Sequence, residues 1–142
     1  MSYRTWFDNH GKKHKEIVAK LEAKGFTKDE VIDYFNFDNM LISEPDFCVL
    51  YKESKKCHNV EKLNCYLCAC PLFRFKESGL SESSGVTTYS YCEVESKHGC
   101  QQQYGEAVHQ NCSSCSVPHG RKYVSVNYDK NWFAIMNQCE VK

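Results

Sequence analysis

The sequence predicts a small α+β protein in which an N-terminal helical hairpin is followed by an irregular, metal-stapled, cysteine-rich module with short strands. Three observations indicate this fold. Apolar residues recur with helical spacing at the start of the chain, cysteine pairs with nearby histidines dominate the middle, and short runs of β-branched and aromatic residues lie around them. Because Pro45 disfavours helix at the residue before it, we place the hairpin in residues 1–46 and the module in residues 47–142.

The first helix of the hairpin is expected over residues 12–24, after an irregular segment over residues 1–11. Its apolar positions share one stripe, with lysine and glutamate on the opposite face. These positions are Ile17, Val18 and Leu21. Gly25 follows where a helix-ending glycine is expected.

A capping box predicts the second helix. Thr27 and Glu30 have the required spacing, with threonine at the N-cap and glutamate three residues later. We expect this helix over residues 28–37, with a short turn continuing through residues 40–42. The hairpin is then a packing platform for the cysteine-rich module, and docking of a partner is the alternative role.

Short elements are expected within the module. Residues 47–51 are predicted to be extended, residues 76–85 an exposed loop, and residues 86–94 a strand that forms one arm of a hairpin. Residues 121–128 alternate in polarity and predict another strand, and residues 132–136 fit a final helical turn.

Three residues outside the cysteine clusters have ordinary structural interpretations. His10 and His14 are spaced to form a metal-binding pair on a helix, but the lysines around them favour two exposed histidines. Cys48 lies in an apolar run, where an isolated cysteine is more often a small core residue than a ligand.

Composition narrows the class of protein. The chain has 142 residues, ten cysteines and a formal net charge of zero, which is not the electrostatic footprint of a nucleic-acid binder. Neither a signal peptide nor a membrane span is recognisable, so we expect a cytoplasmic protein. Thiols stay reduced in the cytosol, and the cysteines are therefore expected to bind metal rather than to form disulfides.

The cysteines gather in two clusters with histidines nearby. Four cysteines and a histidine lie between Cys57 and Cys70, and two more cysteines precede His119. Two Cys-x-x-Cys pairs stand out, Cys65 with Cys68 and Cys112 with Cys115. Such a pair forms a tight turn that brings both sulfurs to one ion. The further candidates exceed the needs of a single tetrahedral ion, so we expect more than one metal.

The motif Asn-Cys-x-x-Cys-x-Cys-Pro-Leu-Phe, with Cys-Ser-Ser-Cys-Ser-Val-Pro-His downstream, resembles the cysteine-rich small domain, a zinc-finger-like family of bacteria and archaea that is regarded as metal-binding. The resemblance covers about residues 57–119. The ligands it implies are Cys57, His58, Cys65, Cys68, Cys70, Cys100, Cys112, Cys115 and His119. Glutamines rather than glycines follow Cys100, and the added Cys92 could replace or supplement it.

Histidine ligands and the spacing of the first cluster favour zinc over an iron–sulfur cluster. We expect a zinc-stapled, non-catalytic binding or adaptor module with a protein partner and without catalytic residues. The main alternative is an iron–sulfur or other metal and redox protein, such as a carrier, chaperone or thiol sensor. A zinc hydrolase is disfavoured because the His-Glu-x-x-His and zinc deaminase signatures are missing from the sequence.

Overall fold

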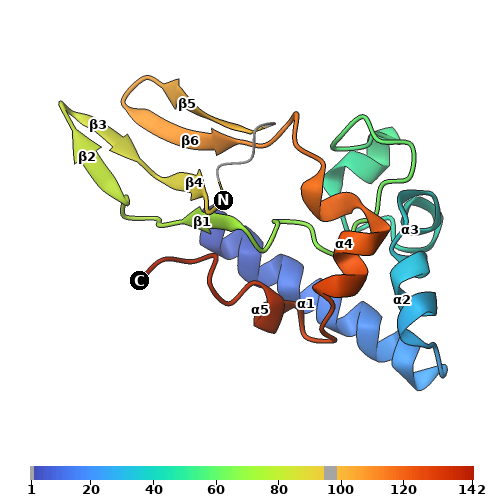
Figure 1. The fold of residues 1–142 in the computed structure, drawn as a ribbon. Helices are drawn as coiled ribbons and strands as arrows, with labels where there is room; N and C mark the ends of the chain where they lie inside the picture. Colours follow the sequence, from blue (N-terminus) through green and yellow to red (C-terminus); the bar gives the residue numbers. More distant parts are fainter. Residues whose placement is uncertain (1, 95–98) are drawn as a thin grey trace.

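The structure is a computed structural model that describes residues 2–94 and 99–142 (Figure 1). The α+β prediction is confirmed, since helices come first and short strands in two small sheets follow. The helical elements are α1 (Tyr3–Ala23), α2 (Lys28–Tyr34), α3 (Phe37–Ser43), the 3-10 helices η1 (Val49–Glu53) and η2 (Val117–His119), α4 (Arg121–Val126) and α5 (Trp132–Ile135). The strands are β1 (Phe73–Phe75), β2 (Ser81–Ser83), β3 (Val86–Thr88), β4 (Ser90–Cys92), β5 (Cys100–Tyr104) and β6 (Ala107–Asn111).

Helix α1 begins much earlier than predicted, so the irregular segment expected over residues 1–11 is wrong. Ser2 caps the helix, its hydroxyl accepting a hydrogen bond from the Thr5 amide at 3.1 Å. Gly11 lies inside this added part, and a Cβ there would come within 2.2 Å of the Phe133 ring. The glycine therefore permits close packing of the α5 segment on α1, a long-range requirement that periodicity could not reveal.

The capping box is confirmed. The Glu30 amide donates to the Thr27 hydroxyl at 3.2 Å, and the Thr27 amide donates to the Glu30 carboxylate at 3.0 Å. Helix α2 ends at Tyr34 rather than at residue 37, and the turn expected after it is a separate helix, α3.

The cap gives a direct stability test. Thr27→Ala removes one of the two reciprocal hydrogen bonds and is expected to lower the free energy of unfolding by about 0.5–2 kcal/mol. Metal content should not change, because the cap lies at the far end of α2 from its junction with α3. Urea unfolding with metal analysis measures both quantities. Loss of metal in this variant would show that the start of α2 helps to build the metal site.

The strands form two small sheets. Strands β1 and β4 pair antiparallel, with Phe73 opposite Cys92. The other sheet has the order β2-β3-β6-β5, in which β3 and β6 are parallel and the other pairs antiparallel. The strand expected over residues 86–94 is therefore two strands, each in a different sheet. Strand β2 lies inside the predicted loop, and β5 and β6 contain too few apolar residues to have been predicted as strands.

Two other predictions are wrong. Residues 47–51 are not extended, because Phe47 and Tyr51 are both buried at helical spacing while Val49 is 81% exposed. Residues 121–128 begin with helix α4 rather than a strand. In α4, Val124 is buried while Val126 is 76% exposed, and the Arg121 guanidinium contacts the Asp33 carboxylate at 3.0 Å. This docking of α4 onto α2 prevails over the β propensity of its valines.

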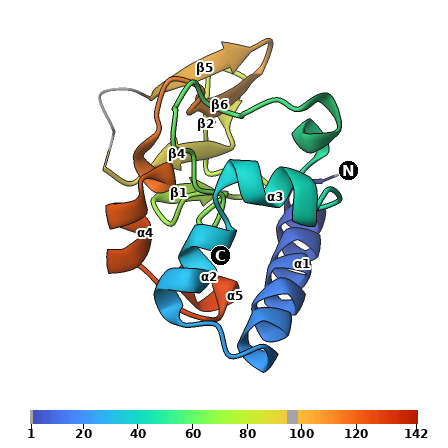
Figure 2. The same ribbon diagram turned by 90° about the vertical axis from the view of Figure 1, so that its right-hand side faces the viewer.

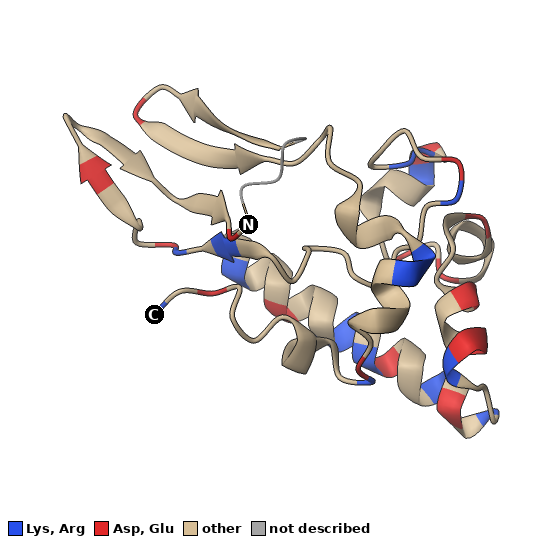
Figure 3. Ribbon diagram, in the orientation of Figure 1, with Lys and Arg blue, Asp and Glu red and all other residues tan. Residues whose placement is uncertain are grey.

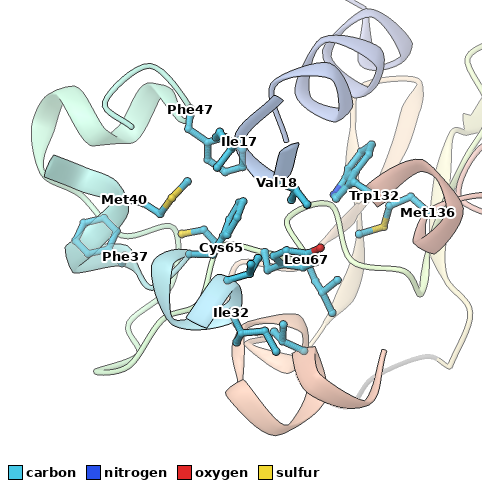
Figure 4. Close-up of a cluster of buried hydrophobic side chains, with 14 of the residues drawn as sticks. Ile17, Val18, Ile32, Phe37, Met40, Phe47, Cys65, Leu67, Trp132 and Met136 are labelled. Carbon is cyan, nitrogen blue, oxygen red and sulfur yellow. The ribbon is translucent and has the colours of Figure 1, made fainter. Parts of the chain in front are cut away.

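One hydrophobic core contains residues from both predicted parts of the chain, as the close-up in Figure 4 shows. Ile17 and Val18 of α1 face the same cluster as Leu67 and Trp132. In Figures 1 and 2 the strands gather near the N-terminal end of α1, and the short helices surround the rest of that helix. The hairpin is thus packed directly against the segment that contains the first cysteine cluster.

Helices α1 and α2 both carry charges of both signs, with basic residues prevailing on α1 and acidic residues on α2 (Figure 3). The formal net charge is zero, with 18 basic and 18 acidic residues. Within the described residues, no helix is both long enough and apolar enough to cross a membrane.

Candidate metal centre

Cys57, His58 and His119 converge in space, although the last is far away in sequence. One potential ligand atom from each residue lies within 4.8 Å of the others. In residues 2–94 and 99–142 this is the one group of three or more Cys, His, Asp or Glu side chains gathered so tightly. The first two residues follow η1, and His119 ends η2, so the group joins the two cysteine clusters.

The His119 ring is held in an orientation suited to metal binding. Its Nδ1 lies 2.8 Å from the Asn64 carbonyl oxygen, which can only accept, so Nδ1 carries the proton and donates. The opposite nitrogen, Nε2, carries no proton and lies 3.7 Å from the Cys57 sulfur, so its lone pair can accept from the thiol or bind a metal in its place. Metal-binding histidines commonly have such a second hydrogen bond, which fixes the tautomer and the ring plane.

His58 is oriented in the same way. Its Nδ1 lies 3.1 Å from the Ser113 carbonyl oxygen, and its ring centroid is 4.7 Å from that of His119. Burial is the main cause that lowers the pKa of His119 to about 4, and the nearby His58 adds to it, against the opposing effect of the hydrogen bond to the Asn64 carbonyl. The His119 imidazole is therefore neutral at pH 7, as a metal ligand must be.

Asn64 connects the site to the helices. Its amide nitrogen donates to the Ile32 carbonyl at 2.7 Å, and its side-chain oxygen accepts from the Tyr66 amide at 2.9 Å. Its backbone amide donates to the His119 carbonyl at 3.0 Å, so two hydrogen bonds join Asn64 and His119. The asparagine precedes the first Cys-x-x-Cys pair in the motif, and its anchoring role was not recognised from the sequence.

Cys65 and Cys68 lie beside the triad rather than in it. Hydrogen bonding from the Cys68 thiol, and then from the Tyr51 hydroxyl, lowers the pKa of the Cys65 thiol although burial opposes this. The same hydrogen bond is the main cause that raises the pKa of Cys68. Cys57 and Cys48 are electrostatic neighbours of the Cys68 thiol. The half-buried Cys48 packs against the core, as expected, but close to this thiol pair.

Tyr51 is a neighbour of this pair that sequence reasoning missed. The side chain is 5% exposed, and within the described part of the chain its hydroxyl has no nitrogen or oxygen partner. It lies instead against the Cys65 sulfur. A hydroxyl that donates to sulfur favours the thiolate, which is the metal-binding form of cysteine.

The remaining predicted ligands, except Cys100, lie around a cavity of about 270 Å³ next to the triad. His58 and His119 form part of its wall. The cysteines that line it are Cys70, Cys92, Cys112 and Cys115. Cys100 is exposed at the start of β5 and borders a different, shallower depression.

The expectation that His10 and His14 are exposed is wrong. His10 is 5% exposed and His14 is 0% exposed, and their rings pack among the aromatic side chains of the core. His10 stacks on Trp6 at 4.8 Å between ring centroids, and His14 donates from Nε2 to the Tyr66 carbonyl at 3.0 Å. They do not belong to the one tight ligand group of the described residues. The early start of α1 places them on its buried face, which explains the error.

The fold and the site thus define a cysteine-rich α+β chain with a Cys/His group suited to binding a metal. No protein-family model, curated protein or solved structure matches the chain. The resemblance to the cysteine-rich small domain is therefore carried by the motif alone.

Proposed function

We propose that the protein is a zinc-binding, non-catalytic adaptor module that acts in the cytoplasm through a protein partner. The single observation that carries the proposal is the convergence of Cys57, His58 and His119, with ligand atoms within 4.8 Å of one another. One sulfur and two imidazole nitrogens are typical zinc ligands, and the neighbouring thiol of Cys65 supplies the fourth position.

A structural role is supported by the environment of the triad. The group includes no Asp or Glu among the described residues, whereas catalytic zinc sites use a nearby carboxylate as base. Its histidines are tied to backbone carbonyls of Asn64 and Ser113, which belong to the two segments that the metal would join. The ion would therefore link the segment of Cys112 and Cys115 to the segment around Asn64, which packs on α2 and α3.

A protein partner is supported by the surface charge. Lysine and glutamate interleave on the helices, and the net charge is zero (Figure 3). Binding of nucleic acid relies on neutralising many phosphates with a basic patch. The mixture of both signs, with no basic patch on these helices, favours a protein surface as the partner instead.

Metal analysis of protein purified without oxygen tests the zinc assignment. Elemental analysis should find zinc bound in stoichiometric amount, with no iron–sulfur absorption in the visible spectrum. Replacement of zinc by Co²⁺ should give the absorption of a tetrahedral site that contains both sulfur and nitrogen ligands. Stoichiometric iron with a cluster spectrum would instead identify the iron–sulfur alternative, and metal-free folded protein would contradict both.

A further inference from the structure

Four cysteines from three separate segments line the cavity beside the triad. Cys70 precedes β1, Cys92 ends β4, and Cys112 and Cys115 lie on the connection from β6 to η2. In Figure 1 this connection descends toward α4 beside the coil that leads into β1. The cavity has a volume of about 270 Å³, and apolar side chains such as Leu72 and Pro118 complete its wall.

The backbone presents these thiols through specific local geometry. Cys112 and Cys115 form a tight turn, in which the Cys115 amide donates to the Cys112 carbonyl at 2.9 Å. The β1–β4 pairing sets Cys92 opposite Phe73, only three residues after Cys70. The two-stranded sheet thereby brings the segments of Cys70 and Cys92 together in the cavity wall.

Cys70 has a backbone conformation that side chains rarely adopt. Its φ angle is +59°, and that of the preceding Ala69 is +86°. Left-handed conformations of residues other than glycine cost about 1–2 kcal/mol each, and they cluster at functional sites. Two in succession, immediately before a strand, turn the chain so that Cys70 joins the lining of the cavity.

The thiols are also close enough to influence one another. Burial raises the pKa of Cys70 to about 11, and the nearby Cys112, Cys92 and Cys115 raise it further. Burial likewise raises the pKa of Cys112, with contributions from Cys115, Cys92 and, least, Cys100, against a hydrogen bond with Gln110 that lowers it. Thiolates gathered in this way repel each other, and a bound cation reverses that repulsion.

We propose that Cys70, Cys92, Cys112 and Cys115 bind a second zinc ion, separate from the one held by Cys57, His58 and His119. Four thiolates give a closed tetrahedral site of the structural type, with zinc–sulfur distances of about 2.3 Å. In the structure the thiols surround the cavity, and rotations about χ1 draw them inward on binding. This assignment makes Cys92 the fourth ligand and leaves Cys100, exposed on β5, outside the site.

The second ion would have a different task from the first. It would tie the β1–β4 sheet to the connection that follows β6, and so join the two sheets. Both ions would lie along the wall of one cavity, since His58 and His119 line it as well. The proposal depends on the thiol-lined cavity alone and does not require the triad to bind metal.

Zinc stoichiometry in matched cysteine variants tests the proposal. Wild-type protein, purified without oxygen, should hold two zinc ions per chain. Cys92→Ser should hold one, whereas the control Cys100→Ser should keep both. The Co²⁺ derivative of wild type should combine an all-sulfur with a mixed sulfur–nitrogen spectrum, and Cys92→Ser should lose the all-sulfur component.

Further variants separate metal loss from misfolding and the two sites from each other. Cys92→His keeps a zinc ligand at this position and should retain two ions. If Cys92 had only a packing role, the larger histidine would not restore the ion that Cys92→Ser loses. Cys57→Ser should lose the mixed component and keep the all-sulfur one. Retention of the all-sulfur component in Cys92→Ser, its loss in Cys100→Ser, or its absence from wild type would each overturn the second site. Only loss of the mixed component from wild type would bear against the triad.

Discussion

His119→Ala is expected to remove zinc from the triad and to destabilise the protein more than any other substitution proposed in this article. The variant deletes the Nε2 ligand beside Cys57 and leaves the buried Asn64 carbonyl without its partner. Binding of structural zinc contributes about 10–16 kcal/mol in small zinc peptides, and that binding energy is folding energy. The hydrophobic core remains in this variant. We therefore expect the free energy of unfolding to fall by several kcal/mol, as for the loss of a buried side chain that both binds metal and donates a hydrogen bond, without complete unfolding.

The loss should be local. Residues 54–64 and 112–120 are expected to lose protection of their amides against hydrogen exchange, because the triad joins these segments. Helix α1 should stay protected, since Phe7 packs on Trp132 with ring centroids 4.7 Å apart, outside the triad. Zinc content, urea unfolding and hydrogen exchange measure the three expectations.

His109→Ala is the matched control. This exposed histidine on β6 stacks on Tyr89 at 5.3 Å and is not part of the triad. It should keep its zinc and lose little stability. If His119→Ala retained zinc and wild-type protection in both segments, the triad would not be a metal site.

Acidification from pH 7 to pH 5 is expected to destabilise the protein through its two buried histidines. Burial lowers the pKa of both His10 and His14 to about 3, with further lowering by Lys13 for the first and by His10 for the second. In the unfolded chain these groups titrate near pH 6.5. Both histidines are therefore neutral in the folded protein. Their contribution to the free energy of unfolding is fully present above pH 6.5 and is lost as the pH falls toward 3. Linkage gives a loss of about 2 kcal/mol per histidine at pH 5.

Substitution of one histidine isolates this effect from metal release, which acid also promotes. The two histidines together make the free energy of unfolding depend on pH, and His10→Phe should remove the half that comes from His10. That half is roughly 2 kcal/mol between pH 7 and pH 5. The phenyl ring suits the site, because His10 lies between the rings of Trp6 and Phe47 at 4.8 and 4.6 Å. It also removes a buried Nε2 atom that has no partner among the described residues, so stability at pH 7 should not fall.

Unfolding in urea at a series of pH values measures the difference between the two proteins. Metal release affects wild type and His10→Phe alike and cancels from the comparison. His109→Phe, at an exposed position, should follow the wild-type curve. Equal pH dependence in His10→Phe and wild type would show that His10 is not buried in neutral form.

Features set by near neighbours were predictable from the sequence. The capping box at Thr27 and Glu30 needs only residues three apart, and the structure contains both of its hydrogen bonds. The final helical turn near Trp132 was likewise predicted from local spacing. The α+β class followed from the same kind of signal.

Features set by distant partners were not predictable. The exposed Val126 gave α4 the alternation of a strand, but its docking through Arg121 and Asp33 decided for helix. His10 and His14 are buried because α1 starts at Tyr3 and packs on rings from other segments. Strands β5 and β6 contain few apolar residues, and they form by pairing with each other and with β3.

The sequence by itself determined that this protein carries cysteines and histidines at spacings typical of metal ligands, because ligand chemistry depends on residue type and knuckle spacing. Which ligands meet was decided only by tertiary structure. Asn64 brings His119 to Cys57, and the β1–β4 pairing brings Cys92 to Cys70 rather than leaving that place to Cys100. The physical reason is that coordination requires atoms a few ångströms apart, and contacts between segments far apart in the chain are what create that proximity.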